Sequence, residues 1–482
     1  APTPPDGFAA DYLLLGLNLV MLWAVLWLVF DLARRLFDAR TAWLALLATL
    51  LSTGVRQQTV AVAGTPLRML LGLGVFWIWA RVDELGASEG SSSGSAARES
   101  AKIAGWLFAL GVGCGLLFLA EYSAGAVVLV AVGYAVFASR ARRRWMAPLC
   151  VVAGFAMSAG PWIARNVALT GHPAGLAGQN VALKFGDSTA EPANQRNTLS
   201  AESPAISLNK VGNKTLTALQ ENLKARIWSG GAMWLAAFFV AGCLYTFRSA
   251  VANRLRWIFA VTLVVAVVAQ AGLNSGESER LAAGWLAPLV IVFGAGFFFV
   301  LLGSNAALSH WPRTAAAVLL TAQAVPLAHD VLEPRRLHFQ YPPYFPGLFI
   351  GMRQELERRD HSGRFGAMAD VPAGVAWYGR QRVWSQPVKL RDFYAITLEQ
   401  PIGELLLTPR TLDRPFFSEL AARPADPGSL LRASDRFGDW GRVYAGLFTG
   451  VLPPEFPLGA PQKLAENLYV LLNPALPPPG GK

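Results

Sequence analysis

Long apolar segments that end at basic or polar turns dominate the sequence, and residues 146–173 show the pattern most clearly. The first fifteen residues of this stretch, MAPLCVVAGFAMSAG, carry no charge. Pro161 and Trp162 then stop the apolar run, and Arg165 and Asn166 follow. A proline and a tryptophan at the end of an apolar helix, with a polar pair just beyond, are typical of a helix that reaches a bilayer interface. The pattern predicts a membrane protein with several spans.

The composition supports this prediction. Of the 482 residues, 53% are hydrophobic and only 15% are charged, whereas a soluble protein carries roughly 25% charged residues. The net charge of +11 lies mainly in short loops between apolar runs, which is a signal of membrane topology and not of nucleic-acid binding. Cys114, Cys150 and Cys243 each lie inside an apolar run, and the five histidines are scattered, so no metal site is predicted.

The apolar segments predict a helical membrane domain of about ten spans over residues 1–332. They lie at 11–30, 41–54, 66–80, the two arms of 102–138, 146–160, 231–247, 257–273, 281–303 and 315–332. A single helix over 102–138 would be about 55 Å long, nearly twice the thickness of the bilayer core. We therefore expect a hairpin with Glu121, Tyr122 and Ser123 at its tip. Residues 82–101 are predicted to be a cytoplasmic linker, and 161–230 an extracytoplasmic loop.

The basic residues predict the orientation. With the N-terminus outside, the short inside loops hold thirteen Lys and Arg residues and the short outside loops hold three. The thirteen are Arg34, Arg35, Arg40, Arg98, Lys102, Arg140, Arg142, Arg143, Arg144, Arg248, Arg254, Arg256 and Arg313; the three are Arg56, Arg68 and Arg280. An excess of cations in short inside loops predicts a multi-pass protein of the cytoplasmic (inner) membrane.

Residues 333–482 are predicted to form a small α/β domain on the extracytoplasmic side. Candidate strands are GAMADV (366–371), RVWSQ (382–386), GELLLT (403–408) and NLYVLL (467–472), and the charged stretch GMRQELERRD precedes them. Asp370, Trp377 and Tyr378 could bind a sugar or a partner, and the alternative is that the two aromatic side chains belong to the domain core.

Ionisable residues near the outside ends of the spans are the candidate site. The predicted substrate-binding residues are Glu121, Arg165, Asn166, Glu279 and Arg280, and Arg56, Gln57 and Gln58 open to the same side. Each charged group also has an explanation that involves no substrate. Arg165 could extend to the interface at a helix end, Glu279 and Arg280 could form a local ion pair, and Glu121 could be a solvated turn residue.

Three stretches resemble the integral-membrane GT-C glycosyltransferases. They are GLLFLAEYSAGAVVLV, GPWIARNVALTGHP and ESERLAAGWLAPLVIVFGAG, and the resemblance covers about residues 11–332. It is nearest to the protein mannosyltransferase and lipid A aminoarabinose transferase type. The resemblance implies transfer of a hexose or pentose from a polyprenyl-phosphate donor to an acceptor outside the membrane, with Arg165 and Arg280 near the donor phosphate. It identifies no cofactor and leaves a divalent metal open.

The family's catalytic acid lies in a loop after its first span, and the contexts of Asp6 and Asp11 do not match it. We therefore expect the chain to lack that span and catalytic loop, with the acid upstream of Ala1. A transporter or flippase for a lipid-linked or polar solute is the main alternative, although the two halves show no internal repeat and the charges are not predicted at the membrane midplane. A non-enzymatic envelope scaffold is the third.

Overall fold

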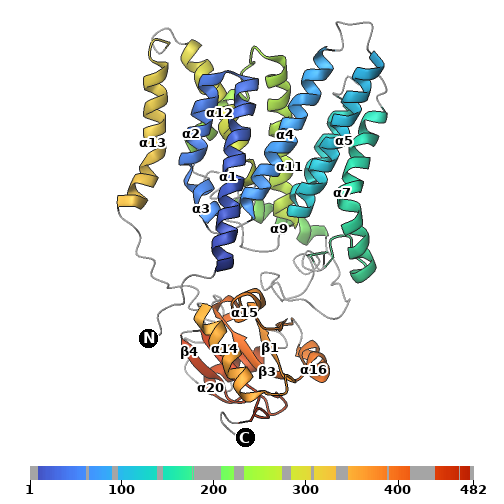
Figure 1. Cartoon of the computed structure of the whole chain (residues 1–482), viewed down its shortest axis with the longest axis vertical. Helices are drawn as coiled ribbons and strands as arrows, with labels where there is room; N and C mark the ends of the chain where they lie inside the picture. The colour runs from blue at the N-terminus through green and yellow to red at the C-terminus, as the bar shows by residue number, and fades with distance from the viewer. Residues whose placement is uncertain are drawn as a thin grey trace.

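The protein consists of a bundle of long helices with a small α/β domain at one end (Figure 1). The computed structural model describes residues 9–60, 64–88, 96–137, 145–175, 177–178, 208–221, 233–273, 284–304, 309–332, 346–387, 390–412, 440–465 and 467–477. We call the end of the bundle next to the C-terminal domain the domain-side end, and the opposite end the far end.

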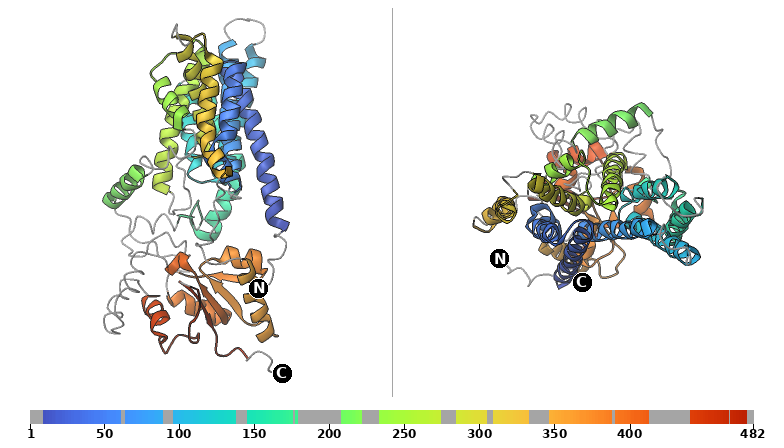
Figure 2. Two further views of the ribbon diagram at one scale, coloured as in Figure 1. Left: turned by 90° about the vertical axis from the view of Figure 1, so that its left-hand side faces the viewer. Right: turned by 90° about the horizontal axis from the view of Figure 1, so that it is seen from above.

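The bundle contains helices at every predicted apolar segment and one further short polar helix, α3. They are α1 (Ala9–Leu36), α2 (Ala39–Leu51), α3 (Thr53–Val60), α4 (Thr65–Ser88), α5 (Ala96–Ala120), α6 (Val127–Phe137), α7 (Met146–Thr170), α10 (Met233–Gly242), α11 (Ala250–Leu273), α12 (Ala287–Ser304) and α13 (Pro312–Leu332). The amphipathic helix α9 (Leu208–Glu221) lies to one side of the bundle (Figure 2).

Within the described residues, five helical segments are long and apolar enough to cross a membrane. They are Ala10–Leu36, Ser100–Ala120, Met146–Thr170, Ala250–Leu273 and Gly284–Ser304. The apolar segments Ala39–Leu51 and Ala124–Phe137 are shorter than a usual span. The chain is therefore a multi-pass membrane protein, but the prediction of ten spans is not confirmed.

The predicted hairpin within residues 102–138 is confirmed. Helix α5 ends at Ala120, a turn follows at Glu121, and a short 3₁₀ helix (Ala124–Ala126) leads into α6. The turn is closed by backbone hydrogen bonds from Glu121 N to Leu117 O (2.9 Å) and from Ala124 N to Glu121 O (3.0 Å). Glu121, Tyr122 and Ser123 therefore form the turn, as predicted.

The boundaries of two predicted loops are wrong. Helix α7 does not stop at Pro161 but continues to Thr170, because a proline removes only one backbone donor and the side chains of Trp162 and Asn166 donate to the Tyr122 hydroxyl. The helix ends at Gly171, whose φ of +74° suits the left-handed cap. The predicted outside loop therefore begins after α7 and contains α9. The 82–101 linker is likewise shortened, because α4 continues to Ser88 and α5 begins at Ala96.

Helices α5 and α7 pack with their backbones in close contact. A Cβ atom on Gly111 would lie 2.0 Å from the carbonyl oxygen of Val151, and one on Gly154 would lie 2.1 Å from that of Phe108. Neither position can hold a larger residue without moving a helix. Small residues at such crossings let membrane helices gain dispersion contacts that lipid would otherwise make.

The C-terminal domain contains a five-stranded mixed sheet in the order β2-β1-β3-β5-β4. The strands are β1 (Gly366–Ala369), β2 (Val383–Ser385), β3 (Ile402–Leu407), β4 (Gln462–Ala465) and β5 (Leu468–Leu472). Strand β1 is parallel to β2 and β3, whereas β5 is antiparallel to β3 and β4. All four predicted strands are confirmed. Strand β4 was not predicted, because its sequence QKLA is short and largely exposed.

Helices cover both faces of this sheet. The helices are α14 (Pro346–Arg359), α15 (Pro372–Gly379), α16 (Leu390–Glu399), α17 (Pro409–Leu412) and α20 (Gly441–Thr449). One core cluster joins Met368 and Leu405 to Phe393 of α16. The other joins Leu406 to Phe349 of α14, and because strand residues alternate between faces, Glu404 shares this side. The domain is therefore a three-layer α/β unit.

Candidate functional site

Glu121, at the hairpin tip, forms an ion pair with Arg68 of α4. The two side chains are only 10% and 11% exposed. The carboxylate also accepts a hydrogen bond from the Ser123 hydroxyl, and Arg68 Nη2 donates to Thr65 Oγ1 (2.8 Å). Thr65 in turn donates to Gln58 Oε1 (3.0 Å), so the network extends toward α3. Glu121 is thus not a solvated turn residue, because the network removes its carboxylate from water.

The residue after Glu121 joins the hairpin tip to the end of α7. The Tyr122 hydroxyl accepts hydrogen bonds from Trp162 Nε1 (2.8 Å) and Asn166 Nδ2 (3.5 Å). Asn166 is buried and also donates to the carbonyl of Pro173 (3.2 Å). Asn166 therefore has a positioning role in this structure, since it fixes the chain that leaves α7.

Arg165 is exposed beside this junction, with its guanidinium carbon 5.0 Å from the centre of the Trp162 ring. The geometry is that of a cation–π contact, which orients the guanidinium without neutralising it. Arg165 therefore keeps its donors available to an anion at the domain-side end.

Arg56 of α3 is the most unusual side chain at this end. Its Nε and Nη2 atoms are buried and have no hydrogen-bond partner. Helix α3 itself is held by Asn18 of α1, whose Nδ2 donates to the carbonyl of Thr59 (3.2 Å). Arg56 as a whole is half-buried, and holding part of a guanidinium away from water without a counter-charge costs free energy. The site is therefore electrostatically incomplete and would be stabilised by an anion.

The structure brings together three of the five predicted site residues. Glu121, Arg165 and Asn166 share the domain-side end through the contacts of Tyr122 and Trp162, and Glu279 and Arg280 lie outside the described residues. Sequence reasoning placed Arg56 on this side without assigning it to the site, and it treated Arg68 as a span-end cation. No local pattern indicates the Arg68–Glu121 pair, because the partners are separated by 53 positions.

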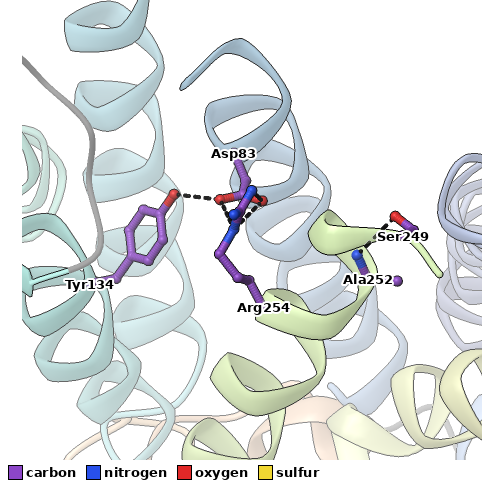
Figure 3. Close-up of polar contacts among 5 residues, drawn as sticks. All are labelled: Asp83, Tyr134, Ser249, Ala252 and Arg254. Carbon is purple, nitrogen blue, oxygen red and sulfur yellow. Dashed lines mark hydrogen bonds and ion pairs between the residues drawn. The ribbon is translucent and has the colours of Figure 1, made fainter. Parts of the chain in front are cut away.

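A second polar cluster lies at the far end and braces three helices (Figure 3). Asp83 of α4 accepts hydrogen bonds from Arg254 Nε (2.8 Å) and Nη2 (2.7 Å) of α11, and the Tyr134 hydroxyl of α6 donates to it (3.3 Å). Nearby, Ser249 Oγ accepts from the backbone N–H of Ala252 (3.2 Å) and caps α11. Asp83 and Arg254 neutralise each other, so this cluster stabilises the packing of α4, α6 and α11.

Two arginines predicted in inside loops are therefore helix residues. Arg254 pairs with Asp83, and Arg256 is buried and donates to the carbonyl of Gly242 (2.8 Å). Helix α11 begins at Ala250, seven residues before the predicted start of that span at 257, because the Asp83 carboxylate and the Gly242 carbonyl accept hydrogen bonds from these cations inside the bundle, although Arg256 Nε is buried without a partner.

The C-terminal domain contacts the bundle through α15. Trp377 Nε1 donates to Asp11 Oδ1 (2.9 Å), and the Tyr378 hydroxyl donates to Asp11 Oδ2 (3.1 Å). Trp377 is 43% exposed and is not a core residue. Tyr378 stacks on Phe349, and burial together with the hydrogen bond to Asp11 raises its pKa. Asp370 instead accepts hydrogen bonds from the Thr408 backbone and hydroxyl within the domain.

Among the residues that the structure describes, no group of three or more His, Cys, Asp or Glu side chains could hold a metal ion. Comparison with protein-family models finds no match, and comparison with curated proteins finds no similar sequence. The features that can indicate a function are therefore Arg56, Arg165 and the Arg68–Glu121 network at the domain-side end.

Proposed function

We propose that the protein is a membrane glycosyltransferase that moves a hexose or pentose from a polyprenyl-phosphate donor to an acceptor on the extracytoplasmic side of the inner membrane. The single observation that carries the proposal is the half-buried side chain of Arg56, in which two buried guanidinium nitrogens have no partner. A lipid phosphate is the anion that can reach such a group at the end of a membrane bundle. A charge-assisted contact to phosphate would offset the cost of burying the cation.

The chemistry of the proposed reaction matches the charge at this end. When the bond between the sugar and the phosphate breaks, negative charge grows on the leaving phosphate. Arg56 and Arg165 would stabilise that charge by hydrogen bonding and by their positive fields. Glu121 already accepts from Arg68 and Ser123, so its role is to hold Arg68 and the hairpin tip in position. We assign no described residue as the base that deprotonates the acceptor.

The test is sugar transfer by the full-length protein, with its catalytic loop, reconstituted in liposomes with radiolabelled polyprenyl-phosphate hexoses and pentoses. Arg56→Gln should lower transfer by roughly 10- to 100-fold, because a hydrogen bond to a charged group contributes about 1.5–3 kcal/mol. The matched control is Arg34→Gln, an exposed arginine near the other end of α1, which should leave transfer unchanged.

Two results would reject the proposal. The first is equal transfer by the Arg56→Gln variant and the wild-type chain, with both proteins monodisperse. The second is movement of a labelled lipid-linked or polar solute across the vesicle without sugar transfer, which would favour a transporter or flippase instead.

A further inference from the structure

The end of α15 lies where the membrane-facing surface of the bundle begins. Asp11, which holds Trp377 and Tyr378, is in the first turn of α1. The next two residues, Tyr12 and Leu13, are 64% and 71% exposed and start the apolar surface of that helix. Two side chains of the C-terminal domain are therefore within hydrogen-bond distance of a residue at the lipid boundary.

The same end of α15 presents cations to solvent. Arg380 is the C-terminal cap of α15 in the left-handed conformation (φ +50°), and Arg382 precedes β2. Both side chains are exposed, and both lie within five residues of the exposed indole of Trp377. Tryptophan and arginine at a membrane boundary have a shared chemistry, since the indole occupies the headgroup region and the guanidinium pairs with lipid phosphate.

We propose that the end of α15, made of Trp377, Arg380 and Arg382, is a membrane-surface contact that binds anionic lipid headgroups, with Asp11 as its anchor on the bundle. The partner is the bilayer next to α1. Because this surface continues into the lipid-facing side of α1, we infer that its partner is the bilayer and not a soluble molecule. Because its two arginines are exposed, we expect it to prefer anionic lipids to neutral ones. The contact holds the C-terminal domain against the membrane independently of any transfer activity.

The test compares the full chain in two kinds of nanodisc, one of phosphatidylcholine alone and one containing a quarter phosphatidylglycerol. The readout is hydrogen–deuterium exchange of the backbone over residues 376–385 at low salt. Because each arginine near an anionic surface contributes a factor of roughly five, phosphatidylglycerol should slow exchange there at least fivefold. Raising the salt to about 0.5 M should remove the difference, since the Debye length then falls to a few ångströms.

Variants separate the lipid contact from simple folding. The double variant Arg380→Gln/Arg382→Gln should lose the dependence on phosphatidylglycerol, whereas Arg442→Gln, an exposed arginine on α20, should keep it. Asp11→Asn should speed exchange in both kinds of nanodisc, because it weakens the anchor and not the lipid pairing. Equal exchange in the two wild-type samples, or a lipid effect that survives the double variant, would overturn the inference.

Discussion

Glu404, in the central strand β3, should make the C-terminal domain less stable as the pH rises. Its side chain is 1% exposed. Burial raises the pKa of its carboxyl from 4.5 to about 7, Gln381 opposes this by donating a hydrogen bond (3.2 Å), and the negative charge of Glu355 raises it further. The folded domain therefore holds a proton that the unfolded chain would release.

The size and sign of the effect follow from these pKa values. A folded pKa above the unfolded one means that the native state binds more protons between pH 4.5 and about 7, so stability falls as the pH rises through this window. The difference of about 2.5 between the two pKa values, at about 1.36 kcal/mol for each unit, gives a loss of about 3 kcal/mol above pH 7. Glu404→Gln has no charge to bury and keeps an oxygen that accepts from Gln381, so it should not show this loss.

The assay is native-state hydrogen exchange of the β3 amides in the full chain, measured between pH 5 and 8 and corrected for intrinsic rates. Relative to Glu404→Gln, the wild-type opening free energy should fall by about 2.5 kcal/mol over this range, because part of the titration lies below pH 5. The control Glu357→Gln changes a side chain that is 66% exposed and should follow the wild-type curve. Parallel pH dependence of the wild-type chain and Glu404→Gln would refute the reasoning.

Three further substitutions test the bundle by thermal melting in detergent. Glu121→Gln should destabilise it by about 3 kcal/mol, because it leaves the charge of Arg68 without its carboxylate, and an unchanged melting temperature would contradict the buried pair. Gly154→Val should cost about 3 kcal/mol or prevent assembly, since its Cβ would lie 2.1 Å from a backbone oxygen, whereas a Gly133→Ala control has open space. Asp83→Asn should also destabilise the bundle by about 3 kcal/mol, and a neutral result would show that the far-end cluster does not brace it.

Local sequence patterns predicted the parts of the fold that depend on local physics. Long apolar runs located the helices, the polar interruption at Glu121 located the hairpin, and short apolar runs located four strands. The helix past Pro161 could not be predicted, because the hydrogen bonds from Trp162 and Asn166 to Tyr122 form only in the folded bundle. The pairing of Asp11 with Trp377 likewise depends on tertiary structure, since 366 positions separate the two residues.

The candidate site was predicted in part for the same reason. The sequence placed Arg165 and Glu121 at one end of the bundle, and the contacts through Tyr122 and Trp162 agree. It did not indicate that Arg56 has buried nitrogens without partners, because burial of single atoms depends on how α3 packs. A sequence shows which residues are charged, but whether a charged group has a partner depends on the folded structure.

The glycines between α5 and α7 also constrain how a long-chain lipid could enter the bundle. Where backbone meets backbone at Gly111 and Gly154, no room is left for an acyl chain to slide sideways between the two helices. A prenyl tail approaching from the bilayer is thereby excluded from this seam. If the proposed polyprenyl donor enters from the bilayer, it must therefore pass between another pair of helices.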